Sequence, residues 1–336
     1  MTVSIIIPCL NEKNYIAKCL DSIVHCTYPT NNLSIYVCDG MSTDGTRDII
    51  SQYSQKYNFI HLLDNPKKTT PFALNIGLKE SKAEIKIILG AHSEIYPDFI
   101  DQCLLAFKND PAIGCVGGII ENEFDDATSE AISCAMSSVF GVGSAHFRTG
   151  TKEGFVDTVA FGAYKQVVFD TIGYFDEELV RNQDDEFNYR VIKHGFKIYL
   201  SRSIRSKYYV RARFKKLFKQ YYQYGYWKVY VNTKHKTVTT TRQIIPALFV
   251  SYIIFCFFTL LIKPLLGFYL SLVFLLYTGL ATFSAWRIAS NLGKIPLIVY
   301  SFFILHLSYG IGYIEGVFNF LIIRKKPSKR YKKSSR

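Results

Sequence analysis

Two patterns of hydrophobic positions divide this sequence. In the first two hundred residues, short apolar runs alternate with amphipathic segments of helical period. The apolar runs predict strands at residues 3–8, 33–39, 60–65 and 84–91. The segments that follow them predict helices at residues 14–26, 44–57, 70–81 and 97–109. Continuous apolar strands between helices are typical of parallel strands, so we expect a sheet that is covered on both faces.

The second pattern is a series of long apolar segments. Residues 244–262 and 265–283 are each 19 residues without a charge, long enough to span a hydrocarbon core of about 30 Å. Residues 295–323 form a longer segment that contains His306 and Glu315. Its glycines, Gly310, Gly312 and Gly316, are expected to allow close helix packing.

The charge is as unevenly distributed as the hydrophobic residues. Residues 202–336 hold 23 Lys and Arg and a single acid, Glu315; since the whole chain has a net charge of +13, residues 1–201 carry −9. Basic residues around an apolar region favour an anionic membrane surface over nucleic acid. Three full spans would place the first domain and the basic tail on opposite sides, against the positive-inside rule. We therefore expect one hydrophobic segment to be re-entrant or interfacial, with three spans as the alternative.

Polar residues gather where the predicted strands end. Asp39, the triplet Gly90-Ala91-His92 and the turn 8–12 all lie at carboxyl ends, where parallel sheets bind ligands. Neither GxGxxG nor GxxxxGK[ST] occurs in the first half, which argues against dinucleotide and P-loop binding. The eight cysteines form no CxxC pair, so we expect reduced, buried thiols. The sequence begins directly on the first strand, so we expect no signal peptide.

Five stretches carry a resemblance to a known family: SIIIPCLNE, VCDGMSTDGT, NIGLKESKAEIKIILGAH, FDEELVRNQDDEFNYRV and QYYQYGYWK. In this order they resemble the inverting family 2 glycosyltransferases, in particular the membrane-attached bacterial subgroup of succinoglycan-biosynthesis type. The resemblance covers about residues 3–230 and, more loosely, the hydrophobic tail. It implies an α/β fold of the GT-A type, a Rossmann-like mixed sheet flanked by helices, followed by C-terminal transmembrane helices. The implied domains are a GT-A domain (1–201), a basic amphipathic interfacial segment (202–243), a membrane domain of two to three hydrophobic segments (244–323) and a basic cytosolic tail (324–336).

The resemblance assigns the residues of the donor side. Asp39 would accept a hydrogen bond from the imide N–H of a uracil-type base, the alternative being a turn residue, whereas Asp44 would cap the next helix. Lys68 would face the diphosphate, and Lys67 is equally well explained as a solvated lysine. The expected nucleotide-binding residues are Pro8, Asn11, Glu12, Asp39, Lys68 and Asn75, with Asn75 fixing its helix against the pocket.

The fourth strand departs from the family. Its usual ending is Asp-x-Asp, whose last acid binds Mg²⁺ or Mn²⁺, but here the triplet is Gly90-Ala91-His92. We expect Ala91 and His92 in the diphosphate and metal region, with His92 as a metal ligand and Glu94 as a further carboxylate. Imidazole ligates Mn²⁺ acceptably, whereas Mg²⁺ prefers oxygen. The expected cofactor is therefore a divalent metal, Mn²⁺ or Mg²⁺.

The acidic segment RNQDDEFNYR carries the expected catalytic base. Inverting transfer needs one base to take the proton of the acceptor hydroxyl. The family places Glu-Asp here, so Asp184 of the pair Gln183-Asp184 is the implied base, while Arg190 is expected to pair with Glu186. Processive relatives have Gln-x-x-Arg-Trp where this chain has Gln220 followed by Gln223-Tyr224. The acceptor side is expected to include Gly162, Ala163, Gln183, Gln220 and Trp227.

These assignments imply the partners and the location. The donor would be a nucleotide-sugar, with UDP-sugar favoured, and the acceptor a lipid-linked or other saccharide at the membrane, with no nucleic acid. The chain would be a multi-pass protein of the cell inner membrane with its catalytic domain on the cytoplasmic side. Two alternatives stay open: a processive polysaccharide synthase, and a catalytically inactive membrane module that binds a nucleotide-sugar.

Overall fold

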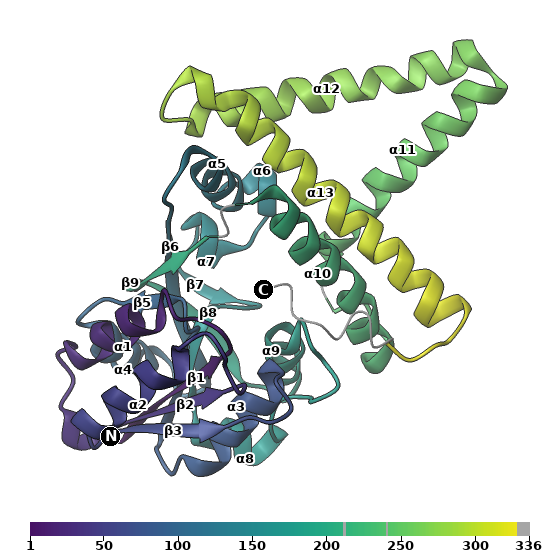
Figure 1. Ribbon diagram of the computed structural model, residues 1–336. Helices are drawn as coiled ribbons and strands as arrows, with labels where there is room; N and C mark the ends of the chain where they lie inside the picture. The colour runs from purple at the N-terminus through teal and green to yellow at the C-terminus, as the bar shows by residue number, and fades with distance from the viewer. Residues whose placement is uncertain (211–212, 240, 328–336) are drawn as a thin grey trace. The chain divides into compact units, whose positions relative to one another are not determined.

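The computed structural model describes residues 1–210, 213–239 and 241–327, and the chain divides into two compact units (Figure 1). The first unit contains residues 1–122 and 146–209, and the second contains residues 123–145 and the chain from residue 210 onward. The expected border at residue 201 thus falls inside a strand, and residues 123–145 belong with the hydrophobic half. Of the expected tail, residues 328–336 lie outside the described residues.

A nine-stranded mixed sheet forms the centre of the first unit. Its strands are β1 (Val3–Cys9), β2 (Leu33–Asp39), β3 (Ile60–Asp64), β4 (Ile85–Ile88), β5 (Ser93–Ile95), β6 (Ile113–Glu123), β7 (Gly154–Val156), β8 (Ala160–Lys165) and β9 (Lys197–Tyr209). They lie in the order β3-β2-β1-β4-β8-β6-β9-β5, with β7 beside β9. The four strands predicted from the sequence are confirmed as parallel neighbours, and Ile5 pairs with both Ile35 and Ile87. The sheet becomes mixed because β8 pairs antiparallel with β4.

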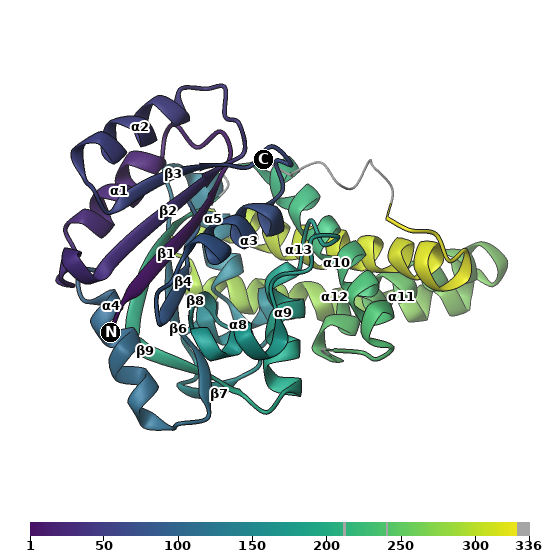
Figure 2. The same ribbon diagram turned by 90° about the horizontal axis from the view of Figure 1, so that it is seen from below.

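Helices cover both faces of the sheet, as the apolar strands predicted (Figure 2). The helices of this unit are α1 (Ile16–Val24), α2 (Thr46–Lys56), α3 (Thr70–Glu80), α4 (Phe99–Ala106), α7 (His146–Thr149), α8 (Gln166–Ile172) and α9 (Gln183–Lys193). One core joins α1, α2 and α4 to the side chains of Ile5 and Val37, and the other joins α3, α8 and α9 to Ile6. Because neighbouring strand residues face opposite sides, each apolar strand feeds both cores.

A buried lysine shows how a charge is accommodated in this sheet. Lys86 lies in β4 with its side chain enclosed, and its Nζ donates to the carbonyls of Leu78 (2.8 Å) and Ser81 (2.9 Å). These carbonyls belong to the last turn and the C-cap of α3, where intrahelical hydrogen bonds end. Burial lowers the pKa of Lys86. The lysine therefore satisfies the end of α3 from within the core.

The second unit is helical over its described residues. Its helices are α5 (Ala127–Met136), α6 (Val139–Val142), α10 (Phe214–His235), α11 (Ile245–Ile262), α12 (Pro264–Ile288) and α13 (Ile295–Val317), which continues as a π-helical turn (Phe318–Ile322). Residues 242–262, 264–288 and 292–322 are long and apolar enough to cross a membrane, judged by length and composition. Strand β9 (Lys197–Tyr209) and helix α10 together occupy most of the segment expected to be amphipathic and interfacial, so that segment is shared between the two units.

Candidate active site

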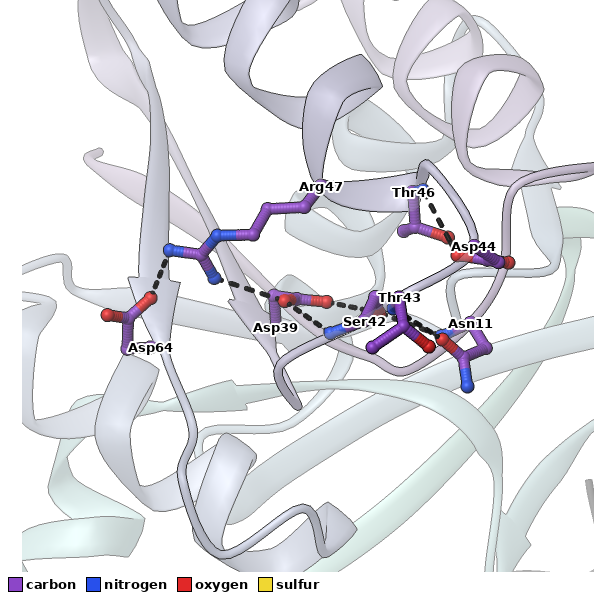
Figure 3. A network of polar contacts seen from close by, with 8 residues as sticks. All are labelled: Asn11, Asp39, Ser42, Thr43, Asp44, Thr46, Arg47 and Asp64. Carbon is purple, nitrogen blue, oxygen red and sulfur yellow. Dashed lines mark hydrogen bonds and ion pairs between the residues drawn. The ribbon is translucent and has the colours of Figure 1, made fainter.

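Two turns at the carboxyl ends of β1 and β2 are tied together by one asparagine. The Asn11 Oδ1 accepts from the backbone N–H of Thr43 (3.0 Å), and the Asn11 backbone N–H donates to the Ser42 Oγ (2.8 Å; Figure 3). Asn11 has a φ of +54°, a conformation that asparagine tolerates better than most residues. Pro8 lies just before this turn, opposite Cys38 in the sheet. The structure thus brings Pro8, Asn11 and Asp39 to one edge.

Asp39 is enclosed by its own neighbours (Figure 3). Its Oδ1 accepts from the Ser42 Oγ (2.5 Å), and its Oδ2 accepts from the Ser42 N–H (3.0 Å) and from Arg47 Nη1 (3.1 Å). The other arm of the Arg47 guanidinium reaches Asp64 Oδ1 (2.5 Å). The Asp39 carboxylate therefore has no exposed surface, and a nucleobase can reach it only after Ser42 or Arg47 moves.

Asp44, the second acid of this stretch, holds the start of α2. Its Oδ1 accepts from both the backbone N–H (3.1 Å) and the hydroxyl (2.6 Å) of Thr46, and its Oδ2 accepts from the Lys13 N–H (3.2 Å). Partial burial raises the pKa of Asp44, but these hydrogen bonds outweigh it, so the pKa lies below its ordinary value. The cap residue itself is Gly45, with a φ of +93°, so Asp44 acts from one position earlier than a standard N-cap.

Glu12 and His92 form a pair beside this edge. The His92 Nδ1 lies 3.3 Å from the Glu12 Oε1, and the His92 ring packs edge-on against Tyr208. Glu12 is buried, and its backbone N–H donates to the Thr46 hydroxyl (2.8 Å). Glu94, the further carboxylate considered above, accepts a hydrogen bond from Tyr209. Ala91 is fully buried.

The donor-side residues after β3 divide into exposed and buried ones. Lys67 and Lys68 are exposed, and Lys68 has a φ of +58°. Asn75 is buried in α3 and bonds Phe175 in both directions: its Nδ2 donates to the Phe175 carbonyl (2.9 Å), and its Oδ1 accepts from the Phe175 N–H (3.0 Å). The same Nδ2 also donates to Glu177 (2.9 Å). Asn75 thus fastens α3 to the loop that leads into α9.

Helix α9 carries the expected base in its first turn. Asp184 follows Gln183, the first residue of the helix, and is exposed to solvent. Part of its side chain is open to solvent, but many protein atoms surround the carboxylate. The pKa of Asp184 is raised, first because this surrounding protein disfavours the charged form and second because the Asp185 carboxylate lies close by. A carboxylate that is accessible and more basic than usual suits a general base.

The other side chains of α9 hold the helix in place. Glu186 is buried and receives two hydrogen bonds from Arg190 (2.8 and 3.0 Å), as the spacing predicted. Arg190 also donates to the carbonyls of Ile172 (2.7 Å) and Tyr174 (2.8 Å). Asn188 accepts from the Tyr164 hydroxyl (2.8 Å). Glu186 therefore has a structural partner, and Asp184 is the exposed acid of this turn.

The expected acceptor-side residues are mostly buried. Gly162 and Ala163 lie inside the sheet on β8, and a Cβ at Gly162 would come within 2.9 Å of the Tyr164 ring. Gln220 and Trp227 belong to α10 in the second unit, where both are buried; the Gln220 Nε2 donates to Tyr224 (2.8 Å). An acceptor role for these four residues and for Gln183 stays a prediction.

Sequence reasoning missed Arg47, Ser42 and Asp64, which surround Asp39. Arg47 was missed because an arginine in the first turn of a helix is usually a solvated surface residue. The available signal was its position eight residues after a buried strand-end aspartate, at the same carboxyl edge as the end of β3.

Comparison with known proteins defines the class. A solved mannosyltransferase, PcManGT from Pyrobaculum calidifontis, has a TM-score of 0.51 at 15% identity and covers 98% of this chain and 76% of its own. S. aureus TarS has a TM-score of 0.51 at 17% identity, covering 73% of this chain and 45% of its own. These likenesses show the fold alone, and together with the mixed sheet and its helices they confirm the GT-A fold.

Sequence comparison then gives the family. The profile of "Glycosyl transferase family 2" matches residues 4–173. The dolichyl N-acetyl-alpha-D-glucosaminyl phosphate 3-beta-D-2,3-diacetamido-2,3-dideoxy-beta-D-glucuronosyltransferase of Methanococcus voltae is 36% identical, covering 66% of this chain and 71% of its own. The succinoglycan biosynthesis protein ExoA of Rhizobium meliloti is 30% identical, covering 72% and 73%. The chain belongs to glycosyl transferase family 2, and the predicted likeness to the succinoglycan-type subgroup is confirmed.

Proposed function

We propose that this glycosyltransferase inverts the anomeric centre as it moves a sugar from a nucleotide-sugar to a membrane-associated, lipid-linked acceptor. Two findings support this acceptor class: the relatives at 36% and 30% identity are named for a dolichyl-phosphate-linked substrate and for succinoglycan, and three apolar helices are long enough to cross a membrane. We further propose that the chain is a multi-pass protein of the cell inner membrane, with its first unit on the cytoplasmic side.

The observation that carries the proposed chemistry is the accessible, basic carboxylate of Asp184 at the start of an anchored helix. In the proposed step, the acceptor hydroxyl oxygen forms a bond to the anomeric carbon while the bond from that carbon to the diphosphate oxygen breaks. The hydroxyl proton passes to the Asp184 carboxylate, and the nucleoside diphosphate leaves. The anchoring of α9 through Arg190 and Asn188 keeps the base in position, which is what such a transfer requires.

A divalent metal would be held by His92 and Glu12. The described residues contain no group of three or more His, Cys, Asp or Glu side chains that could hold a metal. The His92–Glu12 pair offers one imidazole nitrogen and one carboxylate, and the remaining ligands would come from the donor diphosphate and water, a common arrangement for such ions. The nitrogen ligand favours Mn²⁺ over Mg²⁺. Bound there, the metal would offset the charge of the leaving diphosphate.

On the donor side we propose a UDP-sugar. Asp39 would accept from the imide N–H of the base once Ser42 or Arg47 has moved, and the exposed Lys68 would approach the diphosphate. This assignment rests on the resemblance and on the position of Asp39 at the carboxyl edge of β2.

The test is release of nucleoside diphosphate from a panel of UDP-, GDP- and dTDP-sugars by the full chain in detergent with a lipid extract. Reactions contain Mn²⁺, Mg²⁺ or EDTA, with Asp184→Asn and the neighbouring Asp185→Asn as a matched pair. We expect release from one donor, strongest with Mn²⁺, lost in Asp184→Asn and retained in Asp185→Asn. Nucleotide binding without release in any lipid extract would favour the inactive binding module instead. Long products formed without a lipid acceptor would favour a processive synthase.

A further inference from the structure

Helices α10 and α13 of the second unit run side by side in the same direction (Figure 1). Near their starts, the rings of Phe214 and Tyr300 pack edge-on at 4.9 Å. Toward their ends, the ring of Tyr226 lies 4.8 Å from that of Phe320. Contacts that advance together along both helices define a parallel pair over nearly the full length of α10.

Glycines bring the two helices into backbone contact. A Cβ at Gly225 of α10 would lie 2.1 Å from the Tyr309 carbonyl oxygen, and a Cβ at Gly312 of α13 would lie 2.0 Å from the Tyr222 carbonyl oxygen. Neither position accepts a larger residue unless the helices move apart. The predicted role of the α13 glycines in close packing is thus confirmed, and the pair must enter any environment together.

That environment has to suit α10, which is polar. It carries four exposed lysines, Lys215, Lys216, Lys219 and Lys234, and one buried lysine, Lys228. A helix with this many lysines does not lie within hydrocarbon, whereas the headgroup layer accepts both its lysines and its tyrosines.

The direction of the chain leads to the same conclusion. Helices α11 and α12 form an antiparallel hairpin between α10 and α13, with the Tyr252 hydroxyl bonded to the Leu270 carbonyl (2.7 Å). Two crossings return the chain to the face where it started. If α10 also crossed, α13 would have to run opposite to it. If α13 crossed, α10, which runs beside it in the same direction, would cross as well, and the chain would have to return to the first face between α10 and α11. Of the described residues in that interval, only Thr241–Ile244 form a 3-10 turn, which is too short to span about 30 Å.

The hairpin and α13 also differ in what covers them. In their most hydrophobic windows, 17% of the α11 segment and 11% of the α12 segment is buried, compared with 50% for the α13 segment. Between Ser301 and Val317, all described, no residue of α13 is exposed. Helices α5 and α10 cover α13, through residues such as Ile132 and Leu217. Lipid can therefore surround the hairpin, but it cannot surround α13.

We infer that α11 and α12 form a two-helix membrane hairpin with Lys263 at its far end, and that α10 and α13 lie together in the headgroup layer of an anionic bilayer. The segments entering α10 and leaving α13 are then on the same face, so the basic residues before the hairpin and after α13 obey the positive-inside rule. Glu315 of α13, hydrogen-bonded by Tyr222, then lies near water rather than within hydrocarbon.

The experiment maps accessibility in the full chain, with the partly exposed Cys26 and Cys134 replaced by serine. Single cysteines are introduced as Thr237→Cys before the hairpin, Lys263→Cys at its tip and Leu292→Cys after it; all three positions are exposed. A membrane-impermeant maleimide is applied to sealed vesicles of both orientations. An epitope added after Arg336 is tested by protease on the same vesicles.

We expect Thr237→Cys, Leu292→Cys and the epitope to react from one face and Lys263→Cys from the other. An epitope on the face opposite to Leu292→Cys would overturn the interfacial placement of α13. Labelling of Lys263→Cys from the first face, or only after detergent is added, would overturn the crossing hairpin. The inference rests on the membrane attachment in the proposed function but not on its chemistry. Because labelling does not read activity, the two can fail separately.

Discussion

The first unit holds the two carboxylates proposed for donor recognition and for catalysis in opposite ways. Asp39 is buried, and each of its oxygens is already hydrogen-bonded by Ser42 or Arg47. Asp184 is exposed, and its pKa is raised. The Asp39 oxygens are held by fixed protein donors, whereas the Asp184 carboxylate has part of its surface open to solvent and a raised pKa, as a proton acceptor requires. The comparison separates a residue suited to recognition from one suited to proton transfer.

Replacement of Asp184, the exposed carboxylate, should change the activity more than any other substitution considered below. Asp184→Asn removes the base but keeps the size and shape of the side chain, so kcat should fall by about 10²–10⁴-fold with little change in donor KM. Nucleoside diphosphate release measures both parameters. The folded-state pKa of Asp184 is raised, so the ionised carboxylate reduces stability at pH values above it. Asp184→Asn should therefore melt no earlier than the parent at neutral pH, and a lower melting temperature would mean that misfolding caused the loss.

The hydrogen-bonded carboxylate of Asp39 is tested by replacing its partner Arg47. Arg47→Met should leave the buried Asp39 charge with Ser42 alone and lower the free energy of unfolding of the first unit by about 2–3 kcal/mol. Chemical denaturation monitored by far-UV circular dichroism measures the free energy of unfolding of both variants and the parent. Arg47→Lys should lose less, because it keeps the charge but not the forked geometry that reaches both Asp39 and Asp64. Equal stability of Arg47→Met and the parent would show that Ser42 suffices to hold Asp39.

Asn75 connects α3 to the loop that precedes α9, and its replacement removes that connection. Asn75→Leu should lower the free energy of unfolding by about 1–2 kcal/mol, because the Phe175 N–H loses its acceptor inside the protein. Phe175 lies in the loop that precedes α9, which carries Asp184. A less well fixed loop should position Asp184 less well, so kcat should fall as well. The exposed Asn31→Ala serves as the control and should change neither quantity by a measurable amount. An unchanged kcat in a destabilised Asn75→Leu would show that this clasp stabilises the fold without positioning Asp184.

A smaller effect is expected at the proposed metal position. His92→Asp replaces an imidazole nitrogen by carboxylate oxygens, which Mg²⁺ prefers, so the ratio of rates in Mn²⁺ and Mg²⁺ should fall by about 3–10-fold. Titration of activity with each metal measures this ratio. If the ratio does not change, His92 is not a ligand, and its pairing with Glu12 is structural.

The smallest expected effect is a shift along the pH axis. Because Asp185 raises the pKa of Asp184, Asp185→Asn should lower that pKa. Activity requires the ionised base and falls as the pH drops through its pKa, so the acid limb of kcat/KM should move to lower pH, by less than about one unit. A movement to higher pH would contradict the assignment of Asp184 as the titrating base.

Local patterns in the sequence were sufficient for part of this molecule. The strands at residues 3–8 and 33–39 and their helices follow from periodicity, and the capping role of Asp44 follows from its position just before α2. The remainder depends on pairings between distant residues. Strand β8 lies beside β4 although about 75 residues separate them, and no local pattern specifies that neighbour. Residues 123–145 are unremarkable in sequence, and only their packing places them with the hydrophobic helices.

The site shows the same division. The role of Asp184 was implied by a local motif, whereas the enclosure of Asp39 depends on Arg47 folding back from the next helix and on Asp64 from the next strand. This network forms because β2, α2 and β3 lie next to one another in the fold, and hydrophobic periodicity does not predict it.

The filled hydrogen bonds of Asp39 have a consequence for how donors compete. Every nucleotide that uses this carboxylate must first displace a protein group, and this opening penalty is the same for all of them. A base with an N–H at the right position restores the lost bond, whereas a base that presents only a lone pair there does not. If Asp39 recognises the base as proposed, discrimination between nucleotides depends on how well each one replaces the hydrogen bonds of Ser42 and Arg47.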